Sequence, residues 1–127
     1  MIVLLNASNY NAGMRLRESH TQQAIVKYAR MLGLHCFSVP NGAHVSEKNR
    51  LRLKAEGLMP GIPDLFIAQP CAGYAGLFIE VKSARGRLSS VQEEQIDRLS
   101  KNGYMCVVVF SVADAIKAIE NYRSLAG

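Results

Sequence analysis

The alternation of apolar and polar positions divides the 127-residue chain into helical and extended segments. From Glu18 to Leu32 the apolar residues recur at helical spacing, and Gly33 supplies a helix stop. The stretch "HCFSVP" (35–40) predicts a short strand that ends in a Pro-Asn-Gly turn. The charged segment from Glu47 to Glu56, stopped by Gly57, predicts a second helix.

Three further runs predict strands. "DLFIA" (64–68) and "GLFIEVK" (76–82) are separated by a turn-rich stretch, as in a hairpin. "YMCVVVF" (104–110) is apolar almost throughout, which is typical of a strand buried on both faces.

Two helices complete the order of elements. Ser90 with Glu93 predicts a capping box for a helix through Leu99, and Ser111 with Asp114 predicts the cap of a last helix. The order α-β-(α)-β-β-α-β-α predicts an α/β fold, a mixed β-sheet flanked by helices on both faces. We expect a single domain over residues 1–127, with residues 1–16 as an N-terminal extension whose role the pattern leaves open.

Composition narrows the class of protein. A hydrophobic content of 49% indicates a folded domain, and the net charge of +5 favours an anionic partner, nucleic acid first. The three cysteines lack the spacing of a zinc site, and an odd count fits reduced thiols in a cytoplasmic protein of a bacterium or a phage-infected cell. "MIVLL" is too short for a signal peptide and no run reaches membrane-spanning length, so we expect no membrane partner.

Two acids and a lysine stand out in the predicted hairpin. If its loop is centred on Ala72, Asp64 lies opposite Glu80, with Cβ atoms about 4.5–5.5 Å apart on one face. Lys82 emerges on the same face, roughly 6–7 Å along the strand. A slip of one residue would scatter the three side chains, so their meeting depends on this register.

Such a trio supports metal-assisted hydrolysis of a phosphodiester. Asp64 and Glu80 can hold Mg²⁺ or Mn²⁺, with the backbone carbonyl of Val81 as a further ligand. The metal polarises the phosphate and activates water, while Lys82 orients that water or neutralises charge in the transition state.

The alternative is an amphipathic strand whose charges only face solvent. We favour the site for two reasons. Phe66 and Phe78 share the face of the charges, so that face is partly covered, and Asp64 follows a rigid Gly-Ile-Pro turn. Facing carboxylates are also costly unless a cation or a proton lies between them.

The stretches "GIPDL" (61–65), "EVK" (80–82) and "LSSVQ" (88–92), in this order, resemble the VRR-NUC domain, the virus-type replication-repair nuclease branch of the PD-(D/E)xK superfamily. Glu18, Gln22 and Pro40-Asn41 resemble the family's earlier features, so the likeness spans about Glu18 to Phe110. It implies a restriction-endonuclease-like core and a metal-dependent nuclease, with Asp64 and Glu80 as ligands and Lys82 as the catalytic lysine. Stand-alone members are similar to phage-encoded proteins that act on branched DNA as dimers.

Several other residues are candidates for the site. The resemblance brings Glu18 towards the metal, although an acid near a helix start is also explained by the helix dipole. Gln22 lies one turn further on the same face. Gln92 is expected to contact phosphate or position Lys82, or simply to lie exposed, and Gln95 is expected on an exposed helix surface. The remaining candidates for DNA contact are Asn41, Lys48, Arg50, Arg52, Lys54, Arg85 and Arg87.

These features predict a divalent-metal-dependent endodeoxyribonuclease, selective for branched DNA such as junctions or flaps. The alternatives are a non-catalytic nucleic-acid-binding accessory protein and a restriction-like nuclease of duplex DNA. Because one active site cuts one strand, symmetric cleavage of a junction predicts a homodimer, with "MIVLL" as a candidate interface strand or an extra edge strand. His20 and His44 are left out of the site, since lone histidines in polar segments are usually neither acids nor ligands.

Overall fold

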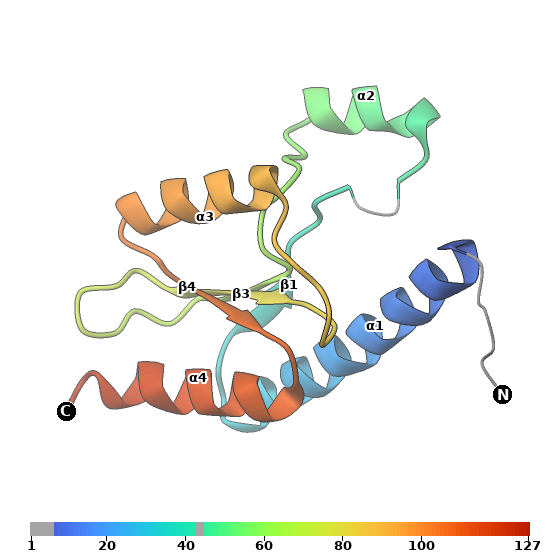
Figure 1. The fold of residues 1–127 in the computed structure, drawn as a ribbon. Coiled ribbons are helices and arrows are strands. Elements are labelled where there is room, and N and C mark those ends of the chain that lie inside the picture. Colours follow the sequence, from blue (N-terminus) through green and yellow to red (C-terminus); the bar gives the residue numbers. More distant parts are fainter. Residues whose placement is uncertain (1–6, 43–44) are drawn as a thin grey trace, which may run out of the picture.

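The computed structural model describes residues 7–42 and 45–127, which form a mixed four-stranded sheet with helices on both faces (Figure 1). The elements are α1 (Ala7–Met31), β1 (Cys36–Ser38), α2 (Glu47–Ala55), β2 (Leu65–Ile67), β3 (Leu77–Val81), α3 (Ser90–Lys101), β4 (Met105–Val109) and α4 (Val112–Ser124). The predicted order of elements and the α/β class are confirmed. None of the helices in these ranges has the length and apolar character needed to cross a membrane.

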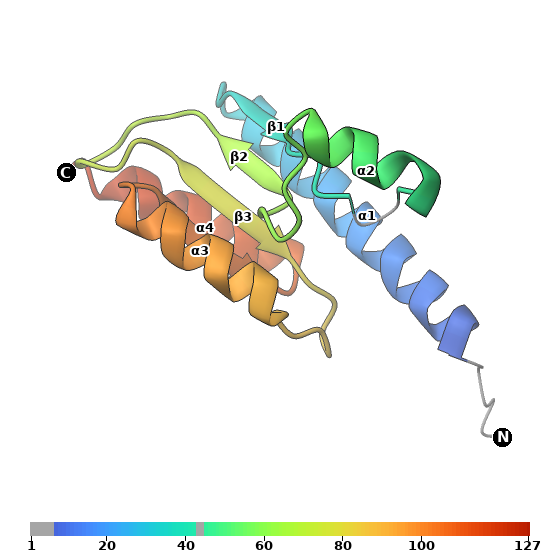
Figure 2. The ribbon, with the colours of Figure 1, turned by 90° about the horizontal axis from the view of Figure 1, so that it is seen from above.

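The strands lie in the order β1-β2-β3-β4. β1 with β2 and β2 with β3 are antiparallel, while β3 and β4 are parallel and need the crossover helix α3 between them. Figure 1 shows α1 and α4 on one side of the sheet and α3 on the other. α2 lies on the side of α3 but stands apart from it when the molecule is viewed from above, and it buries none of its residues (Figure 2).

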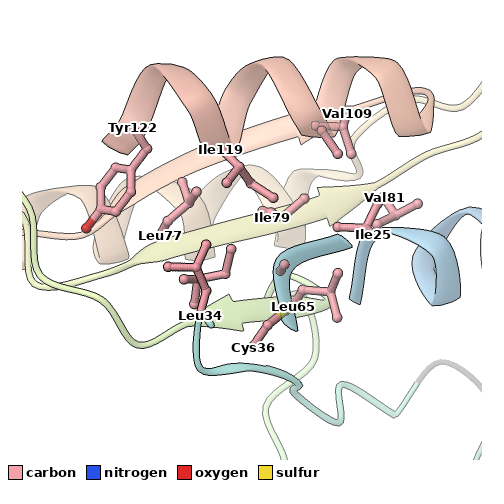
Figure 3. Packing of buried hydrophobic residues seen from close by; sticks show 13 residues of the cluster. Ile25, Leu34, Cys36, Leu65, Leu77, Ile79, Val81, Val109, Ile119 and Tyr122 are labelled. Atoms are coloured by element: carbon pink, nitrogen blue, oxygen red, sulfur yellow. The ribbon is translucent and has the colours of Figure 1, made fainter. Parts of the chain in front are cut away.

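The core fills the space between the sheet and the α1–α4 layer (Figure 3). β3 runs through its centre and all five of its residues are buried. Alternate residues of β3 point into this core, so Leu77, Ile79 and Val81 contribute to it. The residues between them face the α3 side, and one of these is Glu80.

The hairpin adopts the predicted register. Phe66 pairs with Phe78, and Leu65 pairs with Ile79. One residue further in the same register, Asp64 lies opposite Glu80. The rings of Phe66 and Phe78 stack with their centroids 4.5 Å apart. The tip of the loop differs from the symmetric expectation, because the turn lies between Ala72 and Gly73, at φ 50° and 90°.

The asymmetry of the loop leaves one more residue on its first arm than on its second. Cys71 and Tyr74 form an isolated bridge at the tip, whereas Ile67 and Leu77 are the last pair of the strands. Three residues therefore separate the bridge from β2, and two separate it from β3. The first arm, which contains Pro70, absorbs the extra residue without shifting the register of the site.

The first helix is longer than predicted. It begins at Ala7, eleven residues before the expected start at Glu18, and takes up most of the predicted extension. Residues 7–17 lack a regular apolar stripe, so the periodicity gave no signal, although they contain no proline to stop a helix. "MIVLL", the candidate interface or edge strand, lies outside the described residues.

Two predictions about burial and one about capping were wrong. β4 is an edge strand, so of its residues only Val109 is fully buried, and β3 is the strand enclosed on both faces. Gln95 is buried rather than exposed. The cap of α3 is Ser89 with Gln92, one residue before the predicted pair, because Ser89 has the extended backbone of a cap at φ −76° and ψ 164°.

Candidate active site

Asp64 is fixed immediately before β2, where the hairpin opens. Its Oδ2 accepts a hydrogen bond of 2.8 Å from the backbone N–H of Val81, and its Oδ1 accepts one of 3.3 Å from Nδ2 of Asn41. The turn before it needs Gly61, which has φ +87° and leaves no room for a Cβ, since that atom would lie 2.8 Å from the carbonyl oxygen of Val91. This turn therefore sets Asp64 at the sheet and brings the start of α3 against it.

Glu80 lies in the middle of β3 and is 2% exposed. Its Oε1 receives Nζ of Lys82 at 3.5 Å and a hydrogen bond of 3.2 Å from Nε2 of Gln92. Its Oε2 is buried and has no hydrogen-bond partner among the described residues. A buried carboxylate oxygen without a partner is costly, so this oxygen requires either a proton shared with Asp64 or a cation from outside the chain.

Burial makes both carboxyl groups harder to ionise, and Asp64 adds to this effect at Glu80. Burial, together with the neighbouring Asp64 and the more distant Glu18, raises the pKa of Glu80 to about 8, although Lys82 acts against the rise. Burial also raises the pKa of Asp64, against the Val81 N–H and Lys82. Without a cation the pair therefore retains a proton near neutral pH, because both groups are buried and a charge on Asp64 repels one on Glu80.

Glu18 reaches the same region from α1. Its Oε1 accepts a hydrogen bond of 3.1 Å from the backbone N–H of Ser83, just beyond the end of β3. The hydroxyl of Ser83 is buried without a partner among the described residues. Glu18 thus approaches the end of β3 from the face opposite α3, and its charge contributes to the raised pKa of Glu80.

Gln92 connects the start of α3 to Glu80, which the sequence did not predict. Its side-chain Oε1 accepts from the N–H of Ser89 at 3.0 Å, and its own N–H donates to Oγ of Ser89 at 3.2 Å, which closes the capping box. Its Nε2 remains to donate to Glu80. We expected this residue near phosphate, Lys82 or solvent. The sequence placed the cap one residue later, and only the packing of α3 on β3 reveals the bond to Glu80.

The residues present fit a hard divalent cation. Asp64 and the partnerless oxygen of Glu80 supply carboxylate ligands. In an extended strand the N–H and C=O of one residue point the same way, so the carbonyl of Val81, whose N–H bonds Asp64, also faces that carboxylate. Within the described ranges no three His, Cys, Asp or Glu side chains form a complete ligand set. An ion here must take its remaining ligands from water or substrate, as Mg²⁺ commonly does.

The predicted DNA-contacting residues separate into groups. Gln22 and Asn41 line clefts that include Asp64, and Arg50 and Lys54 of α2 line a neighbouring cleft with Gln92. Arg52 instead forms an ion pair of 2.9 Å with Glu56 on the same helix. Lys48, Arg85 and Arg87 are exposed and are not among the residues that line these clefts.

The comparison with protein families identifies the chain. A family model described as the VRR-NUC domain matches residues 8–113. The chain belongs to the VRR-NUC domain family. The predicted family is therefore confirmed, and the mixed sheet flanked by helices is consistent with the predicted α/β nuclease fold. Members of this family are generally nucleases.

Solved structures agree with this membership. A chain described as a VRR-NUC domain protein is 25% identical, covers 85% of this chain and 88% of its own length, and superposes with a TM-score of 0.73. A second chain, described as a VRR-NUC domain, is 24% identical and shows the same fold, with a TM-score of 0.61 over 83% of this chain and 96% of its own. No curated protein matches the chain.

Proposed function

We propose that this VRR-NUC domain is a divalent-metal-dependent DNA endonuclease that hydrolyses phosphodiester bonds, with branched DNA as its preferred substrate. The observation that carries the proposal is the position of Asp64 opposite Glu80, one residue beyond the last pair of β2 and β3, with one oxygen of Glu80 buried and without a hydrogen-bond partner among the described residues. Two facing carboxylates that retain a proton without a cation are better explained by a metal site than by a structural role.

Each side chain has a role that follows from its position. Asp64, Glu80 and the carbonyl of Val81 would hold Mg²⁺ or Mn²⁺, which when bound supplies an activated water and neutralises charge on the phosphate. Lys82, 3.5 Å from Glu80, carries the positive charge that stabilises the pentacovalent phosphate. The water oxygen would form a bond to phosphorus as the bond to the 3′ oxygen breaks, with the proton that the water loses passing to solvent and the 3′ oxygen taking up a proton from solvent. The products are a 5′-phosphate and a 3′-hydroxyl.

The preference for branched DNA and the homodimer rest on the family resemblance and on the need for two active sites to cut a junction symmetrically. A restriction-like nuclease of duplex DNA is the nearest alternative. A non-catalytic DNA-binding protein is the alternative of another class, and the paired carboxylates disfavour it because they repel phosphate unless a cation is bound.

Cleavage assays separate these alternatives. The purified protein is incubated with supercoiled plasmid, linear duplex and a four-way junction, each with Mg²⁺, Mn²⁺ or EDTA. We expect junction cleavage that requires a divalent ion and that Lys82→Ala abolishes. Cleavage that persists in Lys82→Ala contradicts the catalytic assignment, and tight junction binding without any metal-dependent cleavage supports the accessory protein.

A further inference from the structure

Two clefts lined by Asp64 and a third next to them share lining residues and so lie in a row across the site, which we call the furrow. The α1 cleft, of about 450 Å³, is bounded by one face of α1, Ser38 and Asp64. The turn cleft, of about 290 Å³, has Ser38 and Asp64 in its wall as well. It shares Asn41 and Gly42 with the α2–α3 cleft, of about 250 Å³. Asp64 therefore lies along the furrow, with open space on both sides of it.

The two ends of the furrow differ in chemistry. Apart from Glu18, the α1 residues of the α1 cleft are mostly neutral hydrogen-bonding groups, namely Ser19, Gln22 and Gln23. Its one cation, Arg30, is oriented towards β1, since its Nε donates to the carbonyl of Cys36 at 3.1 Å, and its charge is balanced in the same cleft by Glu18 and Asp64.

The other end carries available positive charge. Arg50 and Lys54 are one helical turn apart, so they share a face of α2, and both line the α2–α3 cleft. Neither forms an ion pair within the described part of the chain, and the one hydrogen bond of Arg50, from Nη2 to the carbonyl of Val45 at 3.5 Å, is long and leaves its charge unneutralised. Arg52, which is not on this cleft wall, is neutralised by Glu56. The basic run of α2 is thus split by the fold into a pair facing the furrow and a pair that does not.

We propose that this furrow is the path of one nucleic-acid strand, held by its phosphates in the α2–α3 cleft and by neutral hydrogen bonds in the α1 cleft, with the scissile phosphate at Asp64. The proposal rests on the nuclease function proposed above. It adds that the protein contacts the strand differently on the two sides of the cleavage position. On one side of the cut, Arg50 and Lys54 bind the negatively charged phosphates of the strand. On the other side the protein binds sugar and base groups through amides and hydroxyls.

Salt dependence distinguishes contacts to phosphate from neutral hydrogen bonds. Each phosphate contact that releases a counterion adds about 0.7–0.9 to the steepness of the slope of log affinity against log salt concentration, whereas a neutral hydrogen bond adds nothing. Binding of a four-way junction is measured at several salt concentrations, in Mg²⁺, with Lys82→Ala as the parent so that the DNA stays intact. We expect Arg50→Gln and Lys54→Gln each to reduce the slope by about one contact. Gln23→Ala should weaken binding with an unchanged slope.

Arg52→Gln is the matched control, since it removes the same charge from the same helix away from the furrow. Equal slopes for the Arg50, Lys54 and Arg52 variants would overturn the strand path while leaving metal-dependent cleavage by the wild-type protein intact. If the parent binds no DNA and the wild type cleaves none, the strand path and the nuclease function both fail.

A second measurement locates the phosphate contacts on the substrate. Neutral methylphosphonates replace single phosphates on either side of the cleavage position, and binding by the same parent is measured. We expect a loss of affinity on one side only, and that this loss disappears in the Arg50→Gln, Lys54→Gln double variant. Losses of equal size on both sides would contradict the proposed difference between the two sides.

Discussion

The Oδ2 oxygen of Asp64 accepts the backbone N–H of Val81 at 2.8 Å, just where β2 stops pairing with β3. The carboxylate takes the hydrogen bond that a backbone carbonyl would otherwise make in a continuing ladder. Each carboxylate oxygen has a second lone pair, so this bond orients the side chain without using up its capacity to bind a cation.

Asp64→Asn tests the charge of this group separately from its hydrogen bond. The amide oxygen can still accept from Val81, so we expect the fold to be retained, whereas cleavage should fall by about 100-fold or more because a charged metal ligand is lost. Mg²⁺ should raise the melting temperature of the wild type and leave that of the variant unchanged. The measurements are single-turnover cleavage and thermal unfolding with and without Mg²⁺, and an equal shift in both proteins would remove Asp64 from the ligand set.

The stability of the metal-free protein should fall as the pH rises. The folded state keeps a proton on Glu80 up to about pH 8, whereas the unfolded chain releases it near the ordinary value of 4.5. The folded state therefore binds more protons between these values, and each pH unit in this window lowers the free energy of unfolding by up to about 1.4 kcal/mol.

Glu80→Gln is the matched variant for that pH effect, since it has nearly the same shape and no charge. Melting temperatures measured in EDTA from pH 5 to 8 should fall for the wild type and stay flatter for Glu80→Gln, with the variant the more stable protein at pH 8. Parallel curves for the two proteins would show that Glu80 does not hold the proton.

Variants of Ser89 and Gln92 can test the capping of α3 separately from the hydrogen bond that Gln92 donates to Glu80. Ser89→Ala removes the cap acceptor, and we expect it to destabilise the fold by about 1 kcal/mol while metal affinity is kept. Gln92→Glu keeps the oxygen that closes the capping box but loses the N–H that bonds Glu80. We therefore expect near-normal stability of α3 with altered Mn²⁺ affinity, measured by calorimetry. The same Mn²⁺ affinity in all three proteins would limit Gln92 to capping.

The turn of the β2–β3 hairpin offers a stabilising change. Ala72 has φ 50°, a left-handed conformation that costs a residue with a Cβ roughly 1 kcal/mol. Ala72→Gly removes this strain at some cost in chain entropy, so we expect a net gain of about 0.5 kcal/mol in the free energy of unfolding, measured with urea. Gly73→Ala should act in the opposite direction, since Gly73 has φ 90°. A loss of stability in Ala72→Gly would contradict this account of the turn.

Local patterns in the sequence determined the elements and the register of the hairpin. Turn residues between two apolar runs confined the loop, and the two-residue period of a strand then required Asp64 to face Glu80 once Phe66 faced Phe78. The start of α1 escaped prediction because residues 7–17 have no apolar stripe, and helices of that kind leave no periodic signal.

The tertiary structure decided how these residues act on one another. Packing of α3 against β3 placed Gln92 on Glu80 and excluded water from its second oxygen, and no spacing along the chain encodes that burial. The tertiary structure also decides which cations of α2 line the furrow, because the α2–α3 cleft is built from residues of α2, the turn at Gly61 and the start of α3. Sequence periodicity fixes the face of a strand or helix on which a side chain lies, but the raised pKa of Glu80 and the split of the basic run arise from contacts between elements distant along the chain.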